Sequence, residues 1–253
     1  MNHHFRKRLN SGELLAGTMV SLASPEVAEL LAQVSFDWLF IDAEHSPLDP
    51  LQMQRIMQAA GKDTPCLVRL PSAGDVPIKK ALDSGAAGII VPQINSAQAA
   101  EDVVRLAKYA PVGQRGVGVS RAHGYGLGFQ AYVDQANQET VVVVQAEHIE
   151  AVNHIDEIVA VPGIDAVLVG PYDLSASLEK LGQVDDPQVR AAIDRVTDAC
   201  LQAGVRLGIF GMTAGAVRPY IDAGYTLIVA GIDTVLLGRA ATQLLAELRT
   251  ESR

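Results

Sequence analysis

Reactive side chains gather directly after an apolar run near residue 40. The segment Trp38–Asp42 is almost wholly apolar, and it continues into Ala43, Glu44 and His45. A histidine beside two carboxylates suits proton transfer, because the acids orient the imidazole and tune its pKa. Each residue alone is at least as well explained as a cap for the following loop. Their combination after an apolar strand favours a function, with His45 as the base or proton relay.

A second reactive group is Arg69, which lies near the end of the apolar run Cys66–Leu70. An arginine in a strand needs an anionic or polar partner, because it cannot give up its charge. A substrate carboxylate or carbonyl oxygen is one such partner. A structural ion pair with Asp42 or Glu44 explains the spacing equally well, and the two interpretations are compatible.

Two further carboxylates follow neighbouring apolar runs. Glu147 comes after Val141–Gln145, and Asp173 comes shortly after Ala166–Val169. Two carboxylates from adjacent strands make an oxygen-rich metal site, which suits Mg²⁺ or Mn²⁺, with Co²⁺ as a further candidate. The same pair could also act as the acid and base of a glycosidase, so the carboxylates alone leave the chemistry open.

A short helix is expected to begin after Asp173. Backbone N–H groups near Tyr172 and Asp173 could then hold a carboxylate at the start of that helix. This placement suits a 2-oxo acid as the ligand.

Other mechanisms lack their key groups. The lysines fall in expected helices or loops and never in a strand, so a Schiff-base mechanism has no nucleophile there. G-x-S-x-G, phosphate-loop and H-E-x-x-H motifs are absent, which argues against hydrolase and kinase chemistry.

The reactive side chains can act together only if the fold brings the ends of their strands together, and the sequence predicts such a fold. Short apolar runs alternate with amphipathic segments, as in parallel strands covered on both faces. The expected strands are Ala16–Ser21, Trp38–Asp42, Cys66–Leu70, Gly88–Val91, Val141–Gln145, Ala166–Val169, Arg206–Phe210 and Thr226–Val229. With a length of 253 residues, they predict an α/β fold, a (β/α)8 TIM barrel forming a single domain over 1–253. A doubly wound sheet is the alternative, but no G-x-G-x-x-G follows the first strand.

Helices are expected between these strands. They are Glu26–Gln33, Val76–Leu82, Ala97–Tyr109, Ile149–Val159, Pro187–Ala203, Ala214–Ala223 and Leu237–Arg249. Several are followed by a glycine that suits a helix C-cap, namely Gly85, Gly163, Gly204 and Gly224. The Gly-rich connection Pro111–Gly128 is too long for a plain βα unit, and loops of that length are usually functional or mobile.

Composition narrows the partners. A net charge of −9 without a cluster of Lys and Arg argues against nucleic acid and anionic membranes, so the expected ligand is small. No run of about 18 apolar residues occurs, which predicts a cytoplasmic protein. Cys66 and Cys200 are expected to be buried and unpaired. A charged content of 19% is low for a monomer's surface and favours an oligomer.

Three motifs together resemble the HpcH/HpaI family of class II pyruvate aldolases over nearly the whole chain. The motifs are Phe36–His45, Gln145–Glu147 and Gly170–Ser175, in that order and spacing. The segments Arg115–Gly118 and Leu236–Arg239 are also similar to the family.

The resemblance implies roles for particular residues. Glu147 and Asp173 would ligate the metal, Arg69 would hold the keto oxygen of the substrate, and His45, oriented by Asp42, would manage protons. Gln145 would line the same pocket, and Tyr172 belongs to the matching motif. Family members are often hexamers in which a C-terminal helix packs on a neighbour. An acid from another subunit then approaches the catalytic histidine, and Asp83 matches that position, although an ordinary helix-end carboxylate explains it equally well.

The expected activity is therefore that of a metal-dependent aldehyde-lyase. It would reversibly cleave 4-hydroxy-2-oxo acids into pyruvate or hydroxypyruvate and an aldehyde through an enolate. One alternative is a citrate-lyase-like enzyme acting on acyl-CoA thioesters, which would need a basic patch for the nucleotide phosphates. A second is a catalytically silent barrel that binds an organic acid.

Overall fold

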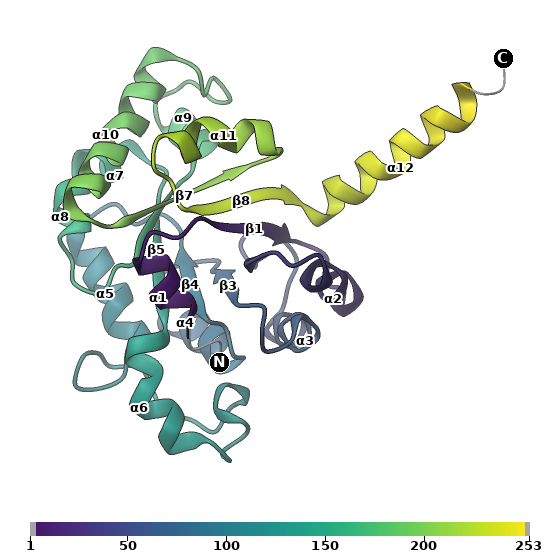
Figure 1. The fold of residues 1–253 in the computed structure, drawn as a ribbon. Coiled ribbons are helices and arrows are strands. Elements are labelled where there is room, and N and C mark those ends of the chain that lie inside the picture. Colours follow the sequence, from purple (N-terminus) through teal and green to yellow (C-terminus); the bar gives the residue numbers. More distant parts are fainter. Residues whose placement is uncertain (1–3, 251–253) are drawn as a thin grey trace.

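The computed structural model describes residues 4–250 and contains a closed barrel of eight parallel strands (Figure 1). Each strand pairs with the next in chain order, and the last pairs with the first. The strands are β1 Leu15–Val20, β2 Trp38–Asp42, β3 Cys66–Arg69, β4 Gly88–Val91, β5 Val141–Ala146, β6 Ala166–Val169, β7 Arg206–Gly211 and β8 Leu227–Ile232. The predicted TIM barrel is confirmed.

Helices connect the strands, and most of them cover the outside of the barrel. They are α1 Phe5–Asn10, α2 Pro25–Gln33, α3 Pro50–Ala60, α4 Asp75–Asp83, α5 Ala97–Ala107, η1 Arg121–His123, α6 Phe129–Glu139, α7 Ile149–Asn153, α8 Ile155–Val159, α9 Pro171–Ser177, α10 Pro187–Ala203, α11 Ala214–Asp222 and α12 Asp233–Thr250. Helices α1, α3 and α6 were not expected from the sequence. The single helix expected over Ile149–Val159 is wrong, because the backbone of His154 leaves the helical conformation and divides it into α7 and α8.

Alternating side chains along each strand divide the core into two layers. Along β2, Trp38 and Phe40 face the barrel interior, whereas Leu39 and Ile41 pack against the surrounding helices. The interior is tight at Gly17, where a β-carbon would lie only 2.7 Å from the indole of Trp38. A side chain at this position would therefore displace the tryptophan, and glycine is required for the packing.

Helix α1 closes the amino-terminal end of the barrel. Its Phe5 and Leu9 are buried in the interior layer, and the rings of Phe5 and Trp38 have centroids 6.3 Å apart. Arg6 in the same helix donates to Asp165, just before β6, at 2.8 Å. The strands finish at the opposite end of the barrel, the end at which α/β barrels carry their active sites.

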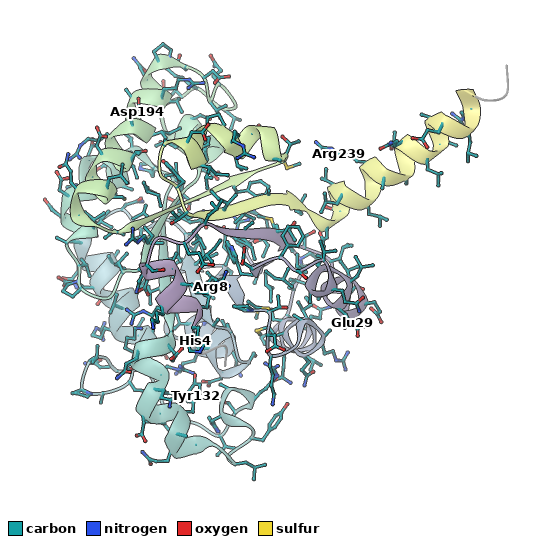
Figure 2. The ribbon with its side chains drawn as sticks, viewed as in Figure 1. His4, Arg8, Glu29, Tyr132, Asp194 and Arg239 are labelled. Atoms are coloured by element: carbon teal, nitrogen blue, oxygen red, sulfur yellow. The ribbon has the colours of Figure 1, made fainter. Side chains whose placement is uncertain are left out.

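The C-terminal helix α12 projects away from the barrel (Figures 1 and 2). It contacts β8 and β1 near its start, and its exposed large apolar side chains are Leu236, Leu237, Leu244, Leu245 and Leu248. Asp233 fixes the first turn, because its carboxylate accepts hydrogen bonds from the backbone of Ser21 and Leu22 at 2.9 Å each. The projecting part of α12 thus carries exposed leucines along its length.

Two smaller expectations can be compared with the structure. Cys66 and Cys200 are buried and free, as predicted, and burial raises the pKa of each thiol to about 12. Among residues 4–250, no helix has both the length and the apolar character needed to cross a membrane. The cytoplasmic location stays a prediction.

Candidate active site

The barrel brings the predicted reactive residues to one end. Asp42 and Arg69 are the last residues of β2 and β3 and are register partners. Gln145 lies near the end of β5, and Glu147 follows that strand directly. Because all strands are parallel, their carboxyl ends meet at the same mouth, where barrels carry their chemistry.

Asp173 reaches the mouth from helix α9, which starts earlier than expected. The sequence predicted a helix after Asp173, but α9 begins at Pro171 with Gly170 as its N-cap. Proline is favoured at the first helical position because its missing N–H has no intrahelical partner there. Asp173 therefore lies in the first turn, close enough for its charge to raise the pKa of both Glu44 and Glu147.

Arg69 and Asp42 form a two-point ion pair. The Nε and Nη2 atoms of Arg69 donate to the two carboxylate oxygens of Asp42, at 2.9 Å each. Burial alone would raise the pKa of Asp42, but the hydrogen bonds and charge of Arg69 outweigh it, so this pKa lies below its usual range. The sequence-based interpretation of Arg69 as a structural partner of Asp42 is thus confirmed, and the guanidinium is held rigidly at the mouth.

Glu44 links this pair to His45. Its Oε2 atom lies 3.3 Å from Arg69 Nε and 3.7 Å from His45 Nε2. Asp42 accepts from the backbone N–H of His45 at 3.3 Å, so it shapes the loop, while the Glu44 carboxylate lies beside the ring. The His45 side chain is 67% exposed, which leaves it free to meet a ligand.

Glu147 is the most unusual group of the site, because it is only 3% exposed and lacks a direct cationic partner among the described residues. Its Oε1 accepts from the backbone N–H of Gln93 at 2.8 Å, and its Oε2 accepts from Gln145 Nε2 at 2.6 Å. Burial, with the negative charges of Glu44 and Asp173, raises the pKa of Glu147 to about 7 despite the Gln93 hydrogen bond. A carboxylate in this situation favours a nearby cation.

The donor set fits a hard divalent cation. Gln145 Oε1 is buried without a hydrogen-bond partner, and it belongs to the side chain that holds Glu147. Within residues 4–250, no group of three or more His, Cys, Asp or Glu side chains is arranged as a complete metal cage. Magnesium-type ions are commonly held by one or two carboxylates, and water and substrate complete the shell. Glu147 and Asp173 are two carboxylates of the kind that such an ion requires.

The remaining predicted site residues lie in different places. Tyr172 is 60% exposed on α9 beside Asp173. Asp83 ends α4, which returns from the mouth to the amino-terminal ends of the strands, and it pairs with Arg115 at 2.7 Å. Within one chain Asp83 is therefore separated from His45, and its catalytic role stays a prediction that needs a second subunit.

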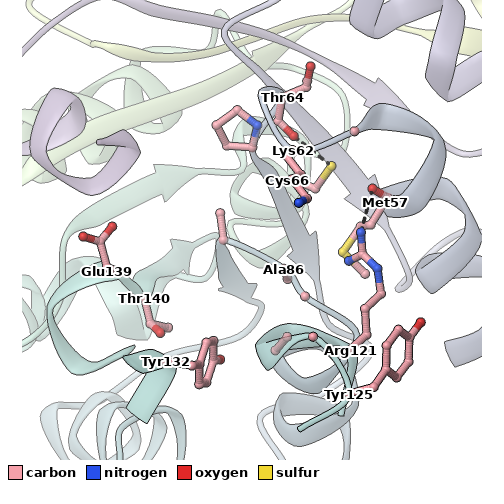
Figure 3. A pocket seen from close by; sticks show the side chains of 16 residues that line it. Met57, Lys62, Thr64, Cys66, Ala86, Arg121, Tyr125, Tyr132, Glu139 and Thr140 are labelled. Atoms are coloured by element: carbon pink, nitrogen blue, oxygen red, sulfur yellow. Dashed lines mark hydrogen bonds between the residues drawn. The ribbon is translucent and has the colours of Figure 1, made fainter. Parts of the chain in front are cut away.

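Neither the buried Lys108 nor a nearby cavity belongs to the site. Lys108, a buried lysine, donates to backbone oxygens of Asn137 and Thr140 near the start of β5. A cavity of about 360 Å³ also lies toward the amino-terminal ends of the strands, beside Cys66, Ala86 and Arg121 (Figure 3). It contains none of the mouth carboxylates, so we do not assign catalysis to it.

The burial of Glu147 predicts an unusual pH dependence for the metal-free protein. Because its pKa in the folded chain is about 7, well above the unfolded value, folding favours the protonated carboxyl. Stability from this group is present at low pH and is lost as the pH rises through 7. We expect the free energy of unfolding, relative to that of Glu147→Gln, to fall by up to about 3 kcal/mol between pH 5 and pH 8.

Urea unfolding of both proteins in EDTA at several pH values measures this difference. The exposed substitution Glu150→Gln is the control, because its carboxylate is not buried. A constant difference between wild type and Glu147→Gln across this range would contradict the prediction.

A barrel with an arginine and a group of carboxylates at the carboxyl ends of its strands has the arrangement of an α/β-barrel enzyme. The family model for HpcH/HpaI aldolase/citrate lyase matches residues 16–240. The chain belongs to this family, as the sequence motifs predicted.

Named relatives and a solved structure agree with this assignment. A hydroxypyruvate/pyruvate aldolase of Paraburkholderia phytofirmans is 38% identical over 97% of both chains. A 4-hydroxy-2-oxo-heptane-1,7-dioate aldolase of Klebsiella pneumoniae is 38% identical over 97% of this chain and 94% of its own. The crystal structure of a family protein from Burkholderia cenocepacia superimposes with a TM-score of 0.94 at 38% identity, covering 98% and 100% of the two chains. The prediction of an aldolase is thereby confirmed.

Proposed function

We propose that the protein reversibly cleaves 4-hydroxy-2-oxo acids into pyruvate or hydroxypyruvate and an aldehyde, with the help of a divalent cation. The observation that carries the proposal is the buried Glu147 carboxylate, close enough to Asp173 for their charges to interact, at a mouth that also holds Arg69. Relatives that are 38% identical over nearly the whole chain are named as aldolases for substrates of this class.

Arg69 is the group that would bind the oxo oxygen of the substrate. Its Nε and Nη2 atoms are occupied by Asp42, and Nη1 makes no hydrogen bond within the described residues. The Nη1 group can therefore donate to an oxygen on which negative charge develops. Because Asp42 holds the guanidinium in place, little reorganisation is needed when that charge appears.

Glu147 and Asp173 are the residues that would hold the cation, with Mg²⁺ or Mn²⁺ as the preferred ions and Co²⁺ as a further candidate. When bound, the cation would supply a Lewis acid that lowers the energy of the enolate. Gln145 would assist by orienting Glu147, since its amide already donates to that carboxylate.

His45 is the candidate for moving the proton at C3 of the 2-oxo acid. Its exposed imidazole can reach a ligand in the mouth, and the Glu44 carboxylate lies 3.7 Å from Nε2, where it can orient the ring. The enolate would then attack the aldehyde carbonyl, and the same groups would serve the reverse cleavage. Asp42 shapes this loop through the backbone of Glu44 and His45.

Exchange of the C3 protons of pyruvate tests this proposal directly. We expect EDTA-treated protein in D₂O to exchange these protons only after Mg²⁺ or Mn²⁺ is added, because enolate formation needs both a base and charge stabilisation. NMR of the methyl signal measures the rate. Metal-dependent exchange followed by product formation with an aldehyde would support the proposal, whereas no exchange in either sample would contradict it.

The same experiment separates the alternatives. A catalytically silent barrel would bind the metal and pyruvate without exchanging protons. A citrate-lyase-like enzyme would act on an acyl-CoA thioester, which can be supplied as a substrate in a parallel assay. The two relatives reported above are named as aldolases, which favours the aldol reaction.

We also propose that the protein is an oligomer, with a hexamer as the family-based expectation. The exposed leucines of α12 need an apolar surface, and a second copy is the candidate partner. We expect Leu244→Asp together with Leu248→Asp to reduce the assembly size in light scattering, while Gln243→Glu on the same helix should leave it unchanged. An unchanged size in the double variant would rule out α12 as the contact.

A further inference from the structure

The carboxylate of Glu147 accepts two hydrogen bonds, and the proposed function gives a role to only one of the donors, Gln145. One oxygen accepts a backbone N–H and the other accepts a side-chain amide, at 2.8 and 2.6 Å. A carboxylate with a donor on each oxygen cannot rotate without breaking one of these bonds. Its remaining lone pairs therefore point in a fixed direction.

The backbone donor comes from a residue in an uncommon conformation. Gln93 has a φ of +57°, in the left-handed region that non-glycine residues seldom adopt. Its side chain is exposed and makes no hydrogen bond with the residues that the structure describes, so the side chain does not explain the conformation. What the conformation achieves is the direction of the N–H toward Glu147. Backbone strain of this kind clusters at functional sites.

Gly170 also lies close to the Glu147 side chain. A β-carbon at Gly170 would lie 2.8 Å from Cβ of Glu147 and 3.1 Å from its Oε2. Gly170 has a φ of −105°, which any residue can adopt, so glycine is not required here for its backbone freedom. It is required because the Glu147 side chain occupies the space.

We propose that Gln93, through its backbone, and Gly170, through its missing side chain, are positioning residues that fix the Glu147 carboxylate for binding of the divalent cation. Together with Gln145 they form what we call the Glu147 cradle. This inference rests on the proposed function, because it assumes that Glu147 holds the cation. Partners that orient a metal ligand typically contribute a factor of about 10 to 100 in metal affinity.

The Gln93 half of the cradle is tested by a pair of substitutions. Gln93→Val places a β-branched residue where φ is positive, so the loop must shift and the N–H must leave Glu147. We expect Mn²⁺ affinity to fall by about 10- to 100-fold. Gln93→Gly keeps the N–H and accepts the left-handed conformation, so it should restore affinity to within about threefold of wild type.

A matched control separates the cradle from general backbone strain. Ser35 is also exposed and has a φ of +68°, but it lies between α2 and β2 at the amino-terminal end of the barrel. Ser35→Val therefore introduces the same strain away from the mouth. We expect it to lower the Tm about as much as Gln93→Val does, without changing Mn²⁺ affinity.

The Gly170 half is tested by adding one carbon. Gly170→Ala should weaken Mn²⁺ binding by about 10- to 100-fold, because the new methyl group displaces the Glu147 carboxylate. Gly215→Ala is the control, since the nearest atom to its β-carbon would be 3.9 Å away. Circular dichroism of both variants checks that the barrel remains folded.

Mn²⁺ affinity is measured without turnover, by EPR of free Mn²⁺ during titration of EDTA-treated full-length protein. Weaker binding in Gln93→Val and Gly170→Ala, with normal binding in the two controls, supports the cradle. If wild type binds Mn²⁺ and both cradle variants bind it equally well, the cradle is wrong and the proposed function stands. If wild type itself does not bind Mn²⁺, the proposed metal-dependent function is wrong and the inference falls with it.

Discussion

Replacing Arg69 by alanine is expected to lower kcat/KM for aldol cleavage by about 10²- to 10³-fold, the usual effect of losing a donor to a developing oxyanion. Among residues 4–250, Arg69 Nη1 makes no hydrogen bond, and two bonds of 2.9 Å to Asp42 hold the guanidinium still. Without it, charge on the oxo oxygen loses a fixed partner. Initial rates with a 4-hydroxy-2-oxo acid and saturating Mn²⁺ measure the effect.

The substitution also leaves Asp42 buried without its cation, which typically costs about 3–5 kcal/mol of stability. Thermal unfolding must therefore accompany the rate measurement, and rates should be compared at a temperature where the variant is folded. Arg190→Ala is a matched control, because Arg190 pairs with Asp185 on the exposed surface. Near-normal cleavage by folded Arg69→Ala protein would remove Arg69 from the mechanism.

Replacing His45 by alanine should lower kcat by about 10²- to 10⁴-fold, the range typical of a lost general base. The imidazole is exposed and forms no buried contact that the fold needs, so the Tm should stay close to that of wild type. Exchange at C3 of pyruvate should fall by the same factor as kcat, because both processes need the same proton transfer. Mn²⁺ affinity should not change, since His45 is not one of the proposed ligands.

The control for His45 is His154, a partly exposed histidine near two carboxylates, Glu150 and Glu157. It lies between α7 and α8, away from the strand ends that carry the site. His154→Ala should leave exchange and cleavage unchanged. If His45→Ala protein exchanges C3 protons at the wild-type rate, another group must be the base.

Most of the barrel could be predicted from local patterns. Continuous apolar runs bounded by turn residues predicted every strand of the barrel. The predicted and observed strand ends differ by three residues at most, as at the end of β8. Helices with strong caps, such as α10 between Pro187 and Gly204, were equally clear. Helix α6 was missed because its apolar face is short and the Gly-rich connection before it resembles a continuous loop.

The sequence by itself determined the fold class, the family and four residues of the mouth, namely Asp42, Arg69, Glu147 and Asp173. Each of these residues ends an apolar strand, directly follows one, or lies in the first turn of the next helix. Only the tertiary structure decided how they are partnered. It placed Glu44 rather than Asp42 beside the His45 ring. It also brought the backbone N–H of Gln93 and the Cα of Gly170, which carries no side chain, close to Glu147. Such contacts join residues far apart in the chain through backbone atoms and excluded volume, which leave no local pattern in residue types.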